Sequence, residues 1–387
     1  MKFIHTSDFQ IGKVYSFFEK SIEAVLQDAR QSAIRRIGEL AHQHGATNVI
    51  VAGDVYDQEQ ITGVTLKKPI EAMRRFDKIR WWLMPGNHDP HADNGLWAKL
   101  AAAGLPENVK LCVKPEPVLM STEGFSSFLL PAPLRFISTA TDQTEWMDGA
   151  ETPEGAARIG LAHGSIRGFD SEGDAKNLID PRRAKSANLS YLALGDWHRQ
   201  IQIDERTWYS GTPEPDRFRL APKSTSTRCN GGQALLVELD GPTATPRISS
   251  LATGHYCWHL IDRTLTEDAQ VDQMASDLEA IESDLSKVVI RVRVSGTLSL
   301  GGRKRFEERI AERFRAAVAG LRLEHDRLIP TPTEADLDEI DRAGFVRVAA
   351  DRLRLLAADS ADPARARIAS LALNRLYLEH VRTAGMQ

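Results

Sequence analysis

Four short motifs rich in Asp, Asn, Gln and His occur along the first 200 residues of the chain. Each follows a short apolar run of the kind that forms a buried strand. They are DFQ at residues 8–10, GDVYD at 53–57, GNHD at 86–89, and the pair HG at 163–164 and GDWH at 195–198. Carboxylate, amide and imidazole groups suit Mn²⁺, Mg²⁺, Fe²⁺ or Zn²⁺ rather than thiophilic metals. Gathered at strand ends, such groups can hold two metal ions that activate water and stabilise a phosphoryl group.

Alternating strands and helices are expected to position these motifs. Three strands and two helices are predicted at the start of the chain, over residues 2–6, 48–52, 80–84, 19–44 and 68–78. Gly45 predicts the end of the first helix, and Pro69 predicts the first turn of the second. Open α/β sheets bind ligands at the carboxyl ends of their strands. The motifs are therefore expected to meet at one edge of an α/β layer.

The character of the sequence changes near residue 250. Beyond it, three strands and two helices are expected, over residues 255–262, 287–294, 321–328, 267–283 and 303–319. We therefore expect a large first domain over 1–250, a small β-α-β-α-β domain over 251–332, and a helical segment over 333–387. Asp362 and Pro363 predict the start of the last helix.

Composition narrows the class of protein. The 387 residues carry 49 Lys+Arg and 53 Asp+Glu, a formal net charge of −4. This net charge excludes a polybasic protein that coats nucleic acid along its whole surface, but it is compatible with a local surface that binds nucleic acid. No apolar run approaches the roughly 20 residues of a membrane span, and the start MKFIHTSD has no leader pattern. Three widely spaced cysteines predict neither a disulfide framework nor a thiolate zinc site. A cytoplasmic protein without membrane contact is the simplest expectation.

Together the motifs resemble the signature of the calcineurin-like metallophosphoesterases, D-x-H, G-D-x-x-D, G-N-H-[DE], H and G-H-x-H in that order. Within that superfamily, IHTSDFQIGK, VIVAGDVYD, MPGNHD and YSGTPEPD are most similar to the SbcD- and YhaO-like DNA repair nuclease subunits. The resemblance covers about residues 1–240. It implies an α/β fold in which a β-sandwich is flanked by helices, followed by a small α+β C-terminal cap and terminal helices. It also implies a metal-dependent hydrolase that cleaves DNA phosphodiester bonds, as an exonuclease or endonuclease, in repair or recombination.

The resemblance assigns roles residue by residue. It implies a first metal position formed by Asp8, Gln10, Asp54 and His198, and a second formed by Asp54, Asn87, His163 and Asp196, with Asp54 bridging. His88 would contact the scissile phosphate and protonate the leaving oxygen. Asp57 would hydrogen-bond His88 and orient it.

Two positions depart from the signature. Gln10 and Asp196 stand where the family has histidine. Replacing two nitrogen ligands by oxygens favours Mn²⁺ first and Mg²⁺ next over Zn²⁺ or Fe²⁺ as the two bound ions. The alternative is that these two ligands have been lost and that one ion is held weakly.

Five cations are candidates for contact with DNA. Arg291 and Arg293 share one face of a predicted strand, opposite an apolar face. Arg303, Lys304 and Arg305 lie at the start of a predicted helix, where the helix dipole disfavours positive charge. A DNA phosphate would offset that cost, and so would a nearby acidic side chain. An ordinary solvated sheet face is the alternative for the two strand residues.

The resemblance also implies partners. SbcD-like proteins act with an SMC-like coiled-coil ATPase (SbcC- or YhaN-like), and the apolar residues of the last helix, about 363–382, would provide the contact. A homodimer is compatible with the sequence. Two other functions stay open: a small-molecule phosphoesterase of the same fold, and a non-catalytic DNA- or ATPase-binding subunit with a degenerate metal site. The small C-terminal domain argues against the first, and the presence of both His88 and Asp57 argues against the second.

Overall fold

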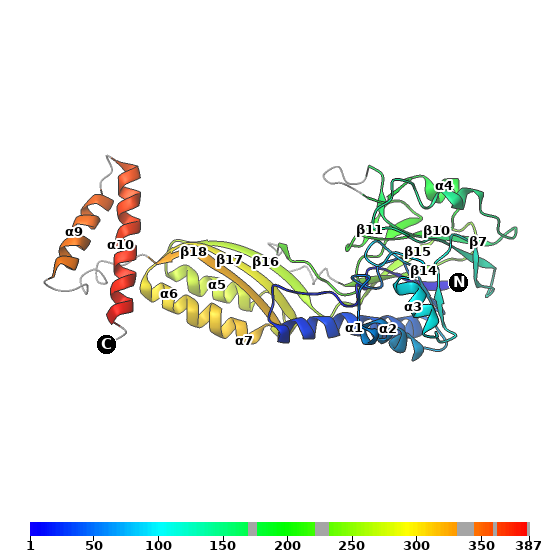
Figure 1. The fold of residues 1–387 in the computed structure, drawn as a ribbon, viewed down its shortest axis with the longest axis horizontal. Coiled ribbons are helices and arrows are strands. Elements are labelled where there is room, and N and C mark those ends of the chain that lie inside the picture. The colour runs from blue at the N-terminus through cyan, green and yellow to red at the C-terminus, as the bar shows by residue number, and fades with distance from the viewer. Residues whose placement is uncertain (169–175, 221–231, 331–343, 359–361, 385–387) are drawn as a thin grey trace. The chain divides into compact units, whose positions relative to one another are not determined.

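The computed structural model describes residues 1–168, 176–220, 232–330, 344–358 and 362–384. The chain divides into two compact units (Figure 1). One unit comprises Met1–Arg217 and Thr227–Trp258, and the other comprises Phe218–Ser226 and His259–Gln387. All four motifs lie in the first unit. The last strand of that unit, β15 (Arg247–Ala252), pairs with the strand before it, so the first unit continues beyond residue 250.

Two six-stranded sheets form the first unit. One has the order β15-β14-β1-β2-β3-β4, with β1 to β4 parallel and β14 antiparallel to β1. Its other strands are β1 (Lys2–Thr6), β2 (Asn48–Val51), β3 (Arg80–Leu83), β4 (Val109–Leu111) and β14 (Gln233–Glu238). The second sheet has the order β11-β12-β10-β7-β6-β5. Its strands are β5 (Val118–Ser121), β6 (Ser127–Ala132), β7 (Ala157–His163), β10 (Tyr191–Gly195), β11 (Ile201–Gln202) and β12 (Thr207–Tyr209). Two short strands between β7 and β10 in the sequence, β8 (Ser165–Ile166) and β9 (Leu178–Ile179), pair with each other in a separate parallel ladder.

Alternating side chains divide the core into layers. Phe3, Ile50 and Trp82 pack in a buried cluster with side chains of β7 and β10, so the two sheets face each other. Ile4 and Val49, on the opposite face, pack against α1 (Lys20–His44), α2 (Gly63–Arg74) and α3 (Leu96–Ala102). The outer face of the second sheet is covered by η1 (Glu145–Gly149) and α4 (Arg183–Ser186). The predicted α/β fold, a β-sandwich flanked by helices, is confirmed.

Of the two helices predicted early in the chain, one ends where expected and the other begins before its expected start. Helix α1 ends where predicted, because Gly45 takes a left-handed conformation with φ 68°. Helix α2 begins earlier than expected, at Gly63, because the Thr62 hydroxyl accepts a hydrogen bond from the Thr65 N–H at 3.1 Å. Pro69 therefore lies inside α2 and not in its first turn, and the prediction for it was wrong.

The second unit has a four-stranded sheet of order β13-β16-β17-β18. Its elements are β13 (Arg219–Leu220), β16 (Cys257–Leu265), α5 (Ala269–Glu279), η2 (Leu285–Lys287), β17 (Val288–Leu298), α6 (Leu300–Phe306), the π-helix η3 (Glu307–Phe314), α7 (Arg315–Ala317) and β18 (Gly320–Pro330). One apolar cluster joins the sheet to the helices. The β-α-β-α-β order read from the sequence is present, although the second helix consists of three successive segments.

Two helices follow among the described residues of the C-terminal segment. They are α9 (Phe345–Ala357) and α10 (Pro363–Ala384), which pack together through Ala350, Leu373 and Tyr377. The Asp362 carboxylate accepts a hydrogen bond from the Arg365 N–H at 3.0 Å, so α10 begins as predicted. Residues 333–343, 359–361 and 385–387 of the expected helical segment lie outside the described residues.

Two further observations bear on the expectations from composition. No helix in the described parts of the chain is long and apolar enough to cross a membrane. Cys112 is a buried free thiol, whereas Cys257 is disulfide-bonded, which the wide spacing of the cysteines did not indicate.

Candidate metal centre

All nine residues that the sequence places in the site lie at the carboxyl ends of strands in the first unit. Asp8 and Gln10 follow β1, Asp54 and Asp57 follow β2, Asn87 and His88 follow β3, His163 ends β7, and Asp196 and His198 follow β10. Strands of both sheets therefore contribute to one group of polar side chains.

Backbone hydrogen bonds fix the loops that carry these residues. The Asp8 N–H donates to Gly53 O at 3.1 Å, and the Gln10 N–H donates to Asp54 O at 2.9 Å. Asp8, Gln10 and Asp54 have positive φ angles of 54°, 43° and 54°. This left-handed backbone turns the chain sharply just after each strand. The loops after β1 and β2 are thus locked to each other before any ligand binds.

A group suited to a metal ion lies at the centre. One ligand atom from each of Asp8, Asp54 and His163 lies within 4.8 Å of the others, and all three residues are buried. His163 Nε2 is 3.4 Å from Asp54 Oδ1. These three residues come from three different strands, as the sequence predicts for a site built at strand ends.

The remaining residues of the second metal position lie around His163. Asn87 Oδ1 is 2.8 Å from His163 Nε2, and Asp196 Oδ1 is 3.9 Å from the same nitrogen. The other ring nitrogen of His163, Nδ1, donates to Ala52 O at 2.7 Å. That bond orients the ring so that Nε2 faces the carboxylates, an arrangement typical of metal-ligating histidines.

The first metal position is arranged differently. His198 Nε2 is 3.8 Å from Asp8 Oδ1 and 3.3 Å from Gln10 Nε2. Gln10 Oε1 accepts a hydrogen bond from Lys13 Nζ at 2.6 Å, so the amide oxygen is already occupied. The residues of this position are close together, but Gln10 presents nitrogen rather than oxygen to its neighbours.

His88 lies at the exposed edge of this cluster, with 43% of its side chain accessible, whereas only 2% of the Asp54 side chain is. Its Nδ1 donates to the backbone O of Asp57 at 2.8 Å, and the Asp57 carboxylate is 3.9 Å away. Asp57 was expected to orient His88, and the structure makes that contact through the backbone carbonyl instead of the carboxylate. Because Nδ1 carries the hydrogen of this bond, Nε2 is the ring atom left to face a substrate.

Asp89 joins the loops that hold Asp54 and His88. Its carboxylate accepts hydrogen bonds from the Tyr56 N–H at 3.0 Å and from the Gly86 N–H at 2.7 Å. Burial raises its pKa well above the usual value, and the nearby Asp54 charge adds to this. Asp89 is therefore a structural residue of the site.

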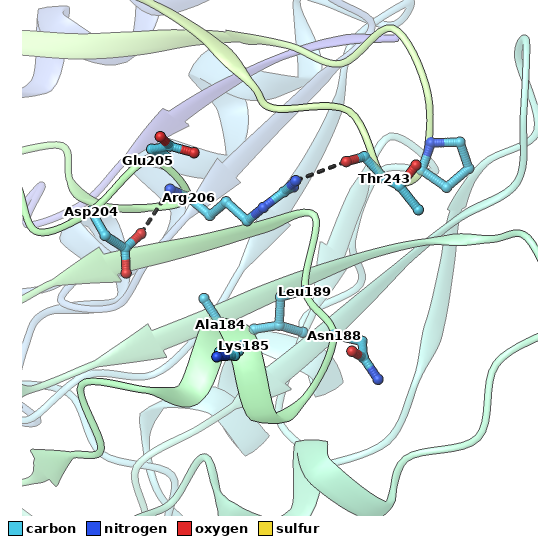
Figure 2. Close-up of a pocket in the computed structure, with 9 residues that line it drawn as sticks. Ala184, Lys185, Asn188, Leu189, Asp204, Glu205, Arg206 and Thr243 are labelled. Atoms are coloured by element: carbon cyan, nitrogen blue, oxygen red, sulfur yellow. Dashed lines mark hydrogen bonds between the residues drawn. The ribbon is translucent and has the colours of Figure 1, made fainter.

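Among the described residues of the first unit, two of the cavities differ in whether site residues line them. One, of about 430 Å³, is lined by Asn87, His88, Ile137 and residues 57–60. The other, of about 470 Å³, is lined by residues near α4 and β12, and none of the nine predicted site residues lines it (Figure 2). In that second cavity Arg206 donates to Thr243 O and to Ser190 O, so its guanidinium is engaged in backbone contacts. The first of these cavities therefore adjoins the cluster through Asn87 and His88.

The five candidate DNA-binding cations have acidic partners within the second unit. Arg291 pairs with Glu324 at 2.9 Å, Arg293 with Asp262 at 2.5 Å, Arg303 with Glu307 at 2.8 Å, Lys304 with Glu308 at 3.9 Å, and Arg305 with Asp272 at 3.4 Å. The start of α6 also has an acidic neighbour, because Asp268 accepts a hydrogen bond from the Ser299 N–H at 3.0 Å. Each of the five cations thus has an acidic side chain within ion-pair distance, and whether any of them contacts DNA stays a prediction.

The sequence profile of the calcineurin-like phosphoesterases (Metallophos) matches residues 1–223 of the chain. The chain belongs to the calcineurin-like phosphoesterase family. Its chemistry is accordingly metal-dependent hydrolysis of phosphoesters. No curated protein matches the sequence.

The solved structures that are similar to this phosphoesterase include two from different organisms. The protein TT1561 of Thermus thermophilus is 11% identical, with 65% of this chain and 98% of that chain covered, at a TM-score of 0.39. GAP50, the anchor in the inner membrane complex of Plasmodium, is 10% identical, with 65% and 84% covered, at a TM-score of 0.39.

The donor set of this phosphoesterase fits divalent metal ions. Asp8 Oδ1 is buried and has no hydrogen-bond partner among the described residues, so a carboxylate oxygen is left for another ligand. Burial of the His163 ring disfavours its charged form, but the carboxylates of Asp54, Asp8 and Asp196 outweigh burial and raise its pKa to about 9. The cluster is thus short of positive charge. A bound cation would supply that charge and displace the His163 proton.

Three residues to which the sequence analysis gave no role, Asp216, Lys13 and Arg30, lie beside the first metal position. His198 Nδ1 donates to Asp216 Oδ1 at 3.0 Å, and Asp216 also lies 3.1 Å from Lys13 Nζ and 3.5 Å from a guanidinium nitrogen of the buried Arg30. Burial alone would raise the pKa of Asp216, but His198, Arg30 and Lys13 together hold it well below its usual value. Asp216 is the last residue of YSGTPEPD, a segment that carries the family resemblance. The resemblance assigned no role to the Asp216 carboxylate.

A methyl group at Gly86 is expected to disrupt the site. An added Cβ would lie 2.1 Å from Asp54 Oδ1 and 2.5 Å from Asp54 N, so Gly86→Ala must move the loop that carries Asp54. We expect a loss of about 1–3 kcal/mol in the free energy of unfolding and weaker metal binding. Urea denaturation and a Mn²⁺ titration measure the two effects. Gly63→Ala is the control, because its Cβ would meet nothing within 4 Å; equal effects for the two variants would contradict the prediction.

Proposed function

We propose that this phosphoesterase hydrolyses phosphodiester bonds in DNA and uses two divalent ions, with Mn²⁺ favoured. The observation that carries the proposal is the position of His88, which is 43% exposed at the edge of a buried carboxylate cluster. An exposed ring of this kind can reach a phosphate within a long polymer, because the polymer need not enter a closed pocket. The similarity of the motifs to SbcD-like nuclease subunits supports DNA as the polymer.

The chain's own residues have distinct tasks in this reaction. Asp54 Oδ1 accepts a hydrogen bond from the His88 N–H at 2.9 Å, which ties the acid to the central carboxylate. The bond from Nδ1 to Asp57 O fixes the plane of the His88 ring, so a proton held at Nε2 is available to the leaving oxygen. Divalent ions bound by Asp8, Asp54, Asn87, His163, Asp196 and His198 would supply charge for the phosphoryl oxygens and a reactive water. The adjacent 430 Å³ cavity would receive the leaving group.

Cleavage of labelled single- and double-stranded linear DNA tests the proposal, with Mn²⁺, Mg²⁺ or EDTA added. We expect Mn²⁺-dependent cleavage that EDTA abolishes, with a higher kcat/KM than for bis(p-nitrophenyl) phosphate. Hydrolysis of the small diester without any cleavage of DNA would assign the small-molecule alternative. No hydrolysis of either substrate by protein with bound Mn²⁺ would assign the non-catalytic alternative.

The same proposal includes a coiled-coil ATPase as the partner. The helices α9 and α10 support this partner, because both carry large apolar side chains that are exposed to solvent. They are Phe345, Val348, Leu355, Ile368 and Leu371. Exposed apolar groups gathered on a helix pair are typical of surfaces that bind another protein.

A further inference from the structure

Lys13 places a positive charge beside the first metal position. Its Nζ lies 2.6 Å from Gln10 Oε1, 3.1 Å from Asp216 Oδ2 and 3.5 Å from Asp57 Oδ1. The side chain is 22% exposed, so it is largely enclosed by these groups. One cation therefore contacts three residues that surround His198 and His88.

The contact with Lys13 determines which way the Gln10 amide points. A lysine ammonium has three donors and no acceptor, so only the amide oxygen can face it. The NH₂ group of Gln10 then lies on the other side, 3.5 Å from Asp54 Oδ2 and 3.3 Å from His198 Nε2. An amide NH₂ donates hydrogen bonds and does not bind a metal ion. In this arrangement Gln10 occupies the first metal position as a donor and not as a ligand.

The second metal position differs from the first, because no described lysine contacts its ligands. Asn87 directs its oxygen towards His163 Nε2 at 2.8 Å. In the described structure, neither a lysine nor an arginine pairs with Asp54 or Asp196, whose ion-pair partners are histidines. The two positions share Asp54 but differ in charge and in which amide atom they present.

We infer that the two metal positions fill unequally, because Lys13 competes with a divalent ion for the Gln10 amide oxygen of the first position. One ion is held tightly at Asp54 and His163. The other binds only when Lys13 withdraws and the Gln10 amide turns its oxygen inward. A phosphate in the site favours this step, since it offers the ammonium another acceptor. The inference rests on the two-ion part of the proposed function and is independent of DNA as the substrate.

A Mn²⁺ titration of the full chain without substrate tests the inference, with free Mn²⁺ measured by electron paramagnetic resonance. For the wild-type protein we expect one tight ion per chain and a second with a Kd at least about 10-fold higher. Lys13→Met removes the competing charge and frees the amide, so it should lower the Kd of the weaker ion by about 10-fold. Asp216 keeps His198 and Arg30 as partners in this variant, so the fold should survive.

Lys20→Met is the matched control. Lys20 pairs with Glu23 at 2.8 Å, its side chain is 88% exposed, and its replacement should leave both affinities unchanged. Lys13→Ala serves as a second variant if Lys13→Met does not fold, as judged by circular dichroism. Two ions of equal affinity in the wild-type protein would overturn the inference. So would an unchanged weaker Kd in a folded Lys13 variant, whatever the outcome of the DNA cleavage assay.

Discussion

Replacing His88 with alanine is expected to reduce the rate of phosphodiester cleavage by about 10²–10⁴-fold, the usual contribution of a general acid. The ring is 43% exposed, and its hydrogen bond is to the backbone O of Asp57, so its removal leaves no buried group unpaired. Stability and metal binding should change little. Steady-state kinetics with Mn²⁺ measure the first effect, and thermal melting with a Mn²⁺ titration measures the others.

His42→Ala is the control for this prediction, because His42 lies exposed on α1, away from all four motifs. Its rate should match that of the wild-type protein. Cleavage by His88→Ala at the wild-type rate would show that another group protonates the leaving oxygen. A lost Mn²⁺ site in this variant would show instead that His88 acts on the metal centre.

Replacing Arg30 with methionine is expected to lower the free energy of unfolding by about 3–5 kcal/mol, as for other broken buried ion pairs. Arg30 is fully buried in α1 and donates to Tyr15 Oη at 3.1 Å, Phe9 O at 2.9 Å and Glu214 O at 3.0 Å. Methionine fills similar space but donates nothing, so these acceptors and Asp216 would remain buried without their cation. Urea denaturation at neutral pH measures the loss.

Arg35→Met, in the same helix, separates this effect from a general change in helix stability. Arg35 is 52% exposed and pairs with Glu39 one turn later, a contact worth about 0.3–0.5 kcal/mol. A loss for Arg30→Met as small as that of Arg35→Met would contradict the prediction. It would mean that water or a neighbouring group replaces the guanidinium.

Local sequence signals predicted the elements that carry the site. The strands β1, β2 and β3 fall within a residue of their expected bounds, because short apolar runs and their flanking residues define them. Gly45 ends α1 for an equally local reason. Pro69 shows the limit of such signals: the cap at Thr62 extends α2 backward, and a favourable start outweighs an interior proline.

Contacts between distant residues were beyond the reach of the sequence. Arg30 lies in an amphipathic helix, where an arginine ordinarily faces solvent, and only the folded chain brings Glu214 to it. The Lys13 side chain is likewise held beside Gln10 by Asp216, about 200 residues further along the chain. Arg293 pairs with Asp262 on the neighbouring strand, a contact that the alternation of the strand sequence could not indicate.

The left-handed backbone at Asp8, Asp54 and Asp196 restricts how this site can change its metal. Their φ angles are 54°, 54° and 97°, a region that asparagine, aspartate and histidine enter far more readily than other residues with a side chain. The exchange of histidine for aspartate at residue 196 is therefore one that the local conformation permits. Glutamate carries the same charge as aspartate but is less suited to these turns. Mutant libraries that aim to alter the metal preference should accordingly place only asparagine, aspartate or histidine at these three positions. Glutamate should be left out, although it conserves the charge.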